Sequence, residues 1–161
     1  MKPMLCGLVL CVAFAAQLLA ADDPYASLRL YDGSWEVRNG SNSAKPDRLT
    51  DHCTLVGTYF VCQQSVNGKV GALLVFVPTA TPGHFYTDNV LPDGRSTGRG
   101  DLTIDGDRWT YNSKGEREGK TTWYRTVNVF TGSDRIHSEG SESADGEHWT
   151  VKRSNDLVRV R

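Results

Sequence analysis

The sequence is poor in the residues and patterns that mark a catalytic or metal centre. Its four histidines, His52, His84, His137 and His148, fall on separate segments without the spacing of zinc ligands. No Gly-x-Ser-x-Gly turn is present to carry a serine nucleophile. The sequence therefore predicts no metal site and no catalytic residue.

An excess of charge of one sign is also lacking, since Lys and Arg number 18 and Asp and Glu number 19. There is no basic stretch of the kind that binds nucleic acid, and no acidic tail. Internal repeats and low-complexity segments are missing as well. This composition predicts no nucleic-acid partner and a single globular domain, because about 140 residues are enough for one core and too few for two.

The one long hydrophobic run lies at the N-terminus, from Leu5 to Leu19, after the short basic start Met1-Lys2 and before Ala20-Ala21. It is too short and too weakly flanked for a spanning helix. We predict a secretory signal peptide over residues 1–21, with its cleavage position open, and one mature domain over residues 22–161 without a membrane span. The protein is then exported, either to the periplasm or out of the cell.

The stretch Asp51–Gln64 predicts a hairpin with a two-residue type II′ turn at Gly57-Thr58. Counting outward from this turn places Cys53 opposite Cys62 in a non-hydrogen-bonded pair, where side chains approach most closely. The other two cysteines leave with the signal peptide. An exported chain with two cysteines in this register is predicted to form one disulfide; a pair of buried free thiols is the alternative.

Short strands alternate with turn dipeptides over the rest of the chain. Asp23-Pro24 predicts a short helix that ends by Tyr31. Turn signals such as Asn67-Gly68, Asp105-Gly106 and Asp145-Gly146 then separate the strands. About ten strands at regular spacing predict an all-β fold, an antiparallel up-and-down barrel with a short N-terminal helix. Two-residue turns at Asp105-Gly106 and Asp145-Gly146 would place Leu102 opposite Trp109, and Trp149 beside Glu142.

Alternation along the strands predicts an inward face that carries Trp123, Arg125 and Val127, and another that carries Trp149, Val151 and Arg153. A buried Arg needs a partner or a water-filled cavity. We therefore predict that Arg125 binds a ligand carboxylate. The predicted ligand-binding residues are Trp123, Arg125, Trp149, Ser138 and Gly140. The alternatives are that the face is inverted, or that Arg125 pairs with Glu142 in the core.

The segment Val70–Val77 is apolar on both faces, which a barrel wall facing water does not need. The N-terminal helix, a long loop or a second subunit is expected to cover it. The last option would give a homodimer through the Val70–Phe76 strand.

Several motifs resemble known barrel families. A short helix followed by Gly33-x-Trp35 resembles the lipocalin-like (calycin) group. A longer match, over nearly the whole mature chain, is to a bacterial family known only as domain of unknown function fifteen-seventy-nine. The matching segments are Gly33-Ser34-Trp35, the Cys53–Cys62 hairpin, Asp105–Tyr111 and Asp145–Thr150. The resemblance implies a lipocalin-like barrel, and it brings no activity or catalytic residues with it.

The resemblance also implies a structural role for Trp35 as a plug at one end of the barrel, with Arg159 or Arg161 from the last strand stacked on it. The Gly-x-Trp-x-Gly-x-Gly pattern of haem-binding nitrobindin-like barrels does not continue here, because Glu36-Val37-Arg38 follow Trp35. No haem and no other cofactor is predicted.

Three functions are compatible with these patterns. The first is a protein that binds a small amphipathic or hydrophobic ligand inside an open barrel. The second is a structural or protein-interaction module with a filled barrel and a partner on the Val70–Phe76 strand. The third is a calycin-type enzyme, which needs a carboxylate or His beside Arg125 inside the barrel.

Overall fold

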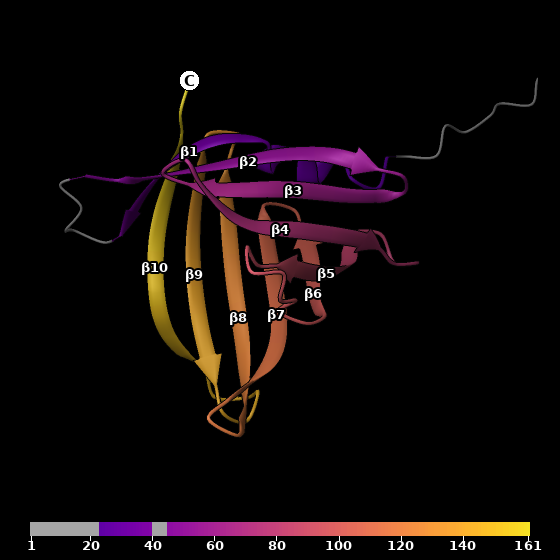
Figure 1. The fold of residues 1–161 in the computed structure, drawn as a ribbon, viewed down its shortest axis with the longest axis vertical. Coiled ribbons are helices and arrows are strands. Elements are labelled where there is room, and N and C mark those ends of the chain that lie inside the picture. Colours follow the sequence, from indigo (N-terminus) through magenta and orange to yellow (C-terminus); the bar gives the residue numbers. More distant parts are fainter. Residues whose placement is uncertain (1–22, 40–44) are drawn as a thin grey trace, which may run out of the picture.

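The chain closes into a single antiparallel β-barrel of ten strands, as a computed structural model shows for residues 23–39 and 45–161 (Figure 1). The barrel order is β1-β10-β9-β8-β7-β6-β5-β4-β3-β2, with β1 also paired to β2. The strands are β1 (Gly33–Asn39), β2 (Asp47–Val56), β3 (Tyr59–Val66), β4 (Lys69–Pro78), β5 (His84–Val90), β6 (Gly100–Asp105), β7 (Arg108–Arg117), β8 (Lys120–Thr131), β9 (Arg135–Ser143) and β10 (Thr150–Arg159). The predicted all-β antiparallel barrel is confirmed. The predicted signal peptide lies outside the described residues.

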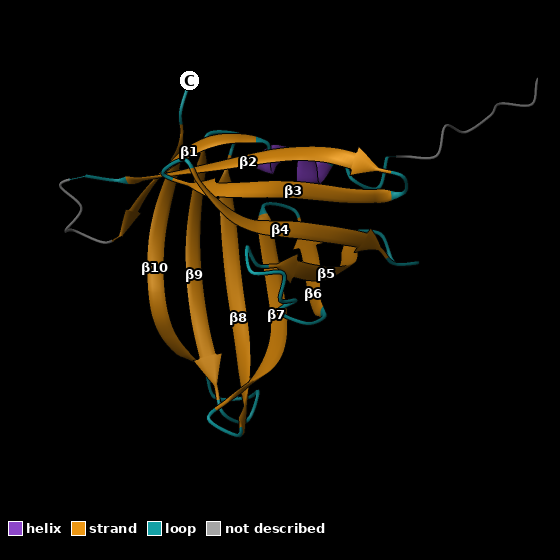
Figure 2. Ribbon diagram, viewed as in Figure 1, coloured by secondary structure: helices purple, strands orange, loops and turns teal. Residues whose placement is uncertain are grey.

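A short 3₁₀ helix, η1 (Ser27–Tyr31), precedes the barrel in the described part of the chain and lies beside β2 and β3 in Figure 2. The Asp23 carboxylate accepts a hydrogen bond from the Tyr25 backbone N–H at 3.0 Å, so the Asp23-Pro24 start orders the turn that precedes η1. Within the described ranges, no helix is long and apolar enough to cross a membrane.

The β2–β3 hairpin has the predicted register. Val56 pairs with Tyr59 and Cys53 with Cys62, and the two cysteines form a disulfide with their Cα atoms 4.0 Å apart. Gly57 has φ +61° while Thr58 keeps a negative φ, as a type II′ turn requires. The predicted disulfide is confirmed.

The β6–β7 turn is centred one residue later than predicted. Gly106 and Asp107 form the turn, so Leu102 pairs with Tyr111 instead of Trp109. Because the partner moves by two residues, each side chain keeps its face, and both Leu102 and Trp109 remain buried inside the barrel.

The last hairpin differs from the expected tight turn. Residues 144–149 form a loop between β9 and β10. The Ser143 hydroxyl accepts backbone N–H bonds from Asp145 and Gly146, and the Asp145 carboxylate accepts them from Glu147 and His148. These bonds hold the pKa of Asp145 well below its usual range. These side-chain hydrogen bonds therefore stabilise a six-residue loop, at residues 144–149, where the Asp145-Gly146 dipeptide alone predicted a two-residue turn.

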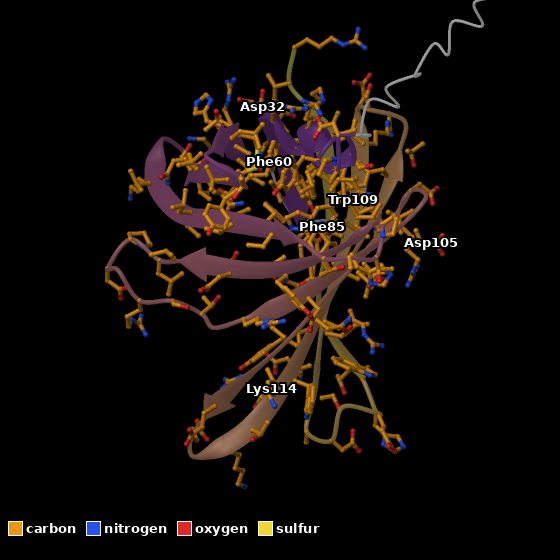
Figure 3. The ribbon with its side chains drawn as sticks, turned by 90° about the vertical axis from the view of Figure 1, so that its right-hand side faces the viewer. Asp32, Phe60, Phe85, Asp105, Trp109 and Lys114 are labelled. Atoms are coloured by element: carbon orange, nitrogen blue, oxygen red, sulfur yellow. A yellow bond between two sulfur atoms is a disulfide. The ribbon has the colours of Figure 1, made fainter. Side chains whose placement is uncertain are left out.

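The apolar core fills the end of the barrel next to η1. Tyr25 and Leu28 of the N-terminal segment pack into the barrel end, and the Tyr25 ring stacks on Phe60 at a centroid distance of 5.5 Å. Figure 3 shows Phe60, Phe85 and Trp109 together at this end, with Lys114 at the other. The N-terminal helix thus plugs the barrel end.

The outer face of β4 is apolar, as the sequence indicated. Its outward residues Leu73, Val75 and Val77 are half-buried, and Val70 near the start of β4 is 69% exposed. The homodimer through Val70–Phe76 stays a prediction.

Candidate functional site: a cavity inside the barrel

A cavity of about 800 Å³ occupies the half of the barrel beyond the core. Its apolar lining includes Trp35, Leu49, Leu74, Phe76, Ile136 and Leu157, and its polar lining includes Asp51, Gln64, Asn89, Tyr124, Thr126, Asn128, Ser138 and Asn155. Inward residues of the strands supply both sets, because alternate side chains share one face of a strand. The interior is open, and its lining combines apolar and polar side chains.

The cavity runs from buried residues near η1 to an exposed rim. Asp51 and Asn128 are 2% and 9% exposed, whereas Asp47 and Arg153, which also line the cavity, are exposed. Figure 1 shows β7–β10 extending beyond the shorter strands on the side away from η1. The rim therefore connects the cavity to solvent, and it carries charges of both signs.

A cluster of hydrogen-bonded polar groups forms the inner end of the cavity. The Tyr31 hydroxyl accepts bonds from the Tyr111 hydroxyl at 2.7 Å and from Asn128 Nδ2 at 2.6 Å. The Tyr31 ring packs edge-on against Trp109 at 5.0 Å, which fixes the hydroxyl at the boundary between core and cavity. Burial raises the pKa of both phenols, so both remain protonated at neutral pH.

Asp51 is the one buried carboxylate among the described residues. On β2 it lies between Gly33 of β1 and Gln64 of β3, and Gln64 Nε2 donates to Asp51 Oδ1 at 3.3 Å. No Lys, Arg or His of residues 23–39 and 45–161 forms an ion pair with it. Burial raises the pKa of Asp51 to about 6, and the neighbouring Asp32 adds to the rise.

The face of β8 predicted to point inward is the outer one. Tyr124, Thr126 and Asn128 line the cavity, whereas Trp123 and Arg125 do not. The Arg125 guanidinium instead stacks on the Trp149 ring at 3.9 Å, and its Nε donates to Asn112 Oδ1 at 3.1 Å. The prediction that Arg125 points into the barrel is therefore wrong, and the alternative of an inverted face is correct.

The loop between β9 and β10 explains the misleading pattern. The Trp123 ring lies so close to Gly146 that an added Cβ would meet it at 3.3 Å, and Trp149 of the same loop covers Arg125. The loop thus shields apolar side chains on the outer face of β8, and that face resembles a core face in the sequence. Glu142, the alternative partner of Arg125, pairs with Arg117 at 3.6 Å.

Ser138 is the residue of the predicted ligand set that lines the cavity. Gly140 is buried on the same face of β9, directly under the Arg153 side chain. Arg153 reaches the rim because a bulge between Val151 and Arg153 shifts the register of β10. Val151 is consequently 56% exposed, and the predicted common face of Trp149, Val151 and Arg153 does not form.

Trp35 is fully buried, and its partner from the last strand is Arg159, whose Cζ lies 4.1 Å from the ring centroid. Arg159 also donates to the backbone oxygens of Asp32 and Ser133, so it connects β10 to the segment before β1 and to the β8–β9 turn. A Cβ at Gly33 would meet the Arg159 guanidinium at 2.6 Å, which explains the glycine of the Gly-x-Trp motif.

The sequence patterns did not indicate Asp51, Tyr31 or Asn128 as site residues. The hairpin register already placed Asp51 opposite Gln64 on the same face as the disulfide. The register does not determine which face of the hairpin points into the barrel. In the part of the chain that the structure describes, no three His, Cys, Asp or Glu residues are grouped to hold a metal ion.

Comparison with known proteins supports the fold. No family model and no curated protein matches the sequence. Among solved structures, the crystal structure of Rv2717c from M. tuberculosis is similar, with a TM-score of 0.50 and 15% sequence identity. The match covers 86% of this chain and 98% of that chain. At this identity the similarity concerns the fold alone.

Proposed function

We propose that this protein is an exported, lipocalin-like barrel of the domain-of-unknown-function family fifteen-seventy-nine that binds a small amphipathic ligand in its interior. The observation that carries the proposal is the cavity of about 800 Å³ lined by both apolar and polar side chains. Small-molecule sites usually have volumes of about 300–1,000 Å³ and combine an apolar lining with a few placed polar groups. The disulfide agrees with an oxidising compartment outside the cytoplasm.

The cavity favours this function over the two other hypotheses. A structural module with a filled barrel would leave no space of this size. An enzyme built around Arg125 would need a carboxylate or His beside that guanidinium inside the barrel, whereas Arg125 lies outside and bonds to the Asn112 amide.

A cavity-filling substitution tests the proposed site. We expect the wild-type protein to bind the neutral fluorophore N-phenyl-1-naphthylamine with enhanced emission, and Ser138→Phe to lower its affinity at least tenfold. The Phe ring would occupy the cavity between β8 and β10, because Ser138 pairs with Asn128 and Asn155. Fluorescence titration measures both affinities.

Arg125→Leu is the matched control, because it changes the outer face of β8 and leaves the cavity intact. Its affinity for the fluorophore should stay within twofold of wild type. Circular dichroism and the thermal midpoint establish that both variants fold. Loss of binding in Arg125→Leu with retention in Ser138→Phe would contradict an interior site.

A further inference from the structure

Two buried side chains at the inner end of the cavity, Asp51 and Asn128, accept fewer hydrogen bonds from the described residues than their oxygen atoms can. Asp51 is nearly fully buried, and among residues 23–39 and 45–161 its carboxylate receives one side-chain hydrogen bond, from Gln64. A buried carboxylate with so little compensation is unfavourable unless it is protonated or a cation joins it. The neighbouring groups do not pair with the carboxylate, because Tyr31 and Tyr111 are neutral phenols and Asp32 is an acid. His52, the next residue on β2, is exposed, and its charge is the last of the causes that act on the Asp51 pKa.

Asn128 provides a second, independent sign of a missing donor. The Asn128 Nδ2 donates a hydrogen bond to the Tyr31 hydroxyl. The Asn128 Oδ1 is buried and has no hydrogen-bond partner in the described part of the chain. Native structures contain few such atoms, since each one costs the desolvation of a polar group. Asn128 lines the same cavity as Asp51, and the Tyr31 hydroxyl to which Asn128 Nδ2 donates is near enough for the Asp51 charge to add to the rise of its pKa.

Charges elsewhere on the cavity wall do not select a ligand. Asp47 and Arg153 line the rim, but they are exposed to solvent and of opposite sign. Their interactions with a ligand are screened by water. The Lys114 ammonium lies over the Trp123 ring on the outer face, 5.5 Å from the ring centroid. Arg153 is also engaged with the wall itself, since its Nη2 donates to the Thr126 hydroxyl at 3.3 Å. Discrimination between ligand charges therefore falls to the buried end.

We propose that the ligand is an amphipathic amine, whose protonated amino group binds the Asp51 carboxylate at the inner end of the cavity with Asn128 Oδ1 as a further acceptor. Its apolar body lies against apolar side chains of the cavity lining, such as Trp35, Phe76 and Leu157. An ammonium group supplies up to three donors and the missing positive charge. This inference rests on the proposed function and adds the chemical class of the ligand.

Three probes with the same aromatic body and different head groups test the inference at pH 7.5. They are 1-naphthylmethylamine, 1-naphthylmethanol and 1-naphthoate, and isothermal titration or displacement of the neutral fluorophore gives their affinities. We expect the amine to bind at least tenfold more tightly than the alcohol, and the carboxylate to bind most weakly. In Asp51→Asn the amine should lose its preference and bind within threefold of the alcohol.

The wild-type protein supplies the same contrast without a substitution. Between pH 7.5 and pH 5 the affinity for the amine should fall several-fold as Asp51 takes up a proton, while the affinity for the alcohol stays constant. An alcohol or carboxylate that binds as tightly as the amine, or an amine preference that survives in Asp51→Asn, would overturn the inference. In that case, binding of the neutral fluorophore with its loss in Ser138→Phe would still support the proposed function. Failure of all four probes to bind would contradict both.

Discussion

Trp35→Ala is expected to lower the free energy of unfolding by about 3–5 kcal/mol, the range for removing a large aromatic side chain from a packed site. Trp35 is fully buried, its indole N–H donates to the Tyr31 backbone oxygen at 3.2 Å, and the Arg159 guanidinium stacks on its ring. The substitution removes all three interactions at once. Urea unfolding followed by circular dichroism measures the change.

Trp123→Ala is the matched control on the outer face of β8. Trp123 is half-buried and contacts the loop between β9 and β10, so its loss should cost roughly 1–2 kcal/mol, near the average for single substitutions. An equal or larger loss in Trp123→Ala than in Trp35→Ala would mean that the faces of these strands are assigned incorrectly.

Asp51→Asn is expected to stabilise the protein at pH 7.5 by up to about 3 kcal/mol, because burial raises the pKa of Asp51 to about 6 from an unfolded value near 4. The native state therefore binds the Asp51 proton more tightly than the unfolded state does. Between about pH 4 and pH 6 this difference makes the stability fall as pH rises. Asparagine has no proton to lose and removes that penalty.

The pH dependence separates this effect from a general change in packing. The stability difference between Asp51→Asn and wild type should be small at pH 4 and reach its maximum above pH 7, as measured by urea unfolding across this range. Asp47→Asn, on the same strand at the exposed rim, should change stability by less than about 0.5 kcal/mol at every pH. If Asp51→Asn were less stable than wild type at pH 7.5, the claim that the buried Asp51 carboxylate lacks compensating interactions would be wrong.

Local patterns in the sequence were sufficient to predict the β2–β3 hairpin and its disulfide. A two-residue turn fixes the register of its strands, so the pairing of Cys53 with Cys62 follows from counting. The barrel class could be predicted for a similar reason. Each turn dipeptide is a local signal, and together they mark the ends of successive antiparallel strands. At the β6–β7 turn the centre was misplaced by one residue, and the faces were still correct.

The site could not be predicted because it depends on contacts between distant segments. The loop at residues 144–149 covers Trp123 and Arg125 on the outer face of β8, and nothing in the β8 sequence indicates this cover. Likewise, a bulge in β10 moves Arg153 to the cavity rim away from the exposed Val151. The inward orientation of Asp51 could not be predicted, because it depends on which face of the hairpin lies inside the closed barrel.

The most direct test of an interior binding site uses the indole N–H signals of the protein's four tryptophans in a ¹H–¹⁵N correlation spectrum. Trp35 lines the cavity, whereas Trp123 and Trp149 lie outside it. During titration with N-phenyl-1-naphthylamine, the Trp35 signal should shift through the ring current of the bound probe, and the Trp123 and Trp149 signals should stay in place. Shifts at Trp123 and Trp149 with an unchanged Trp35 signal would place the ligand on the outer face of β8 and contradict the account.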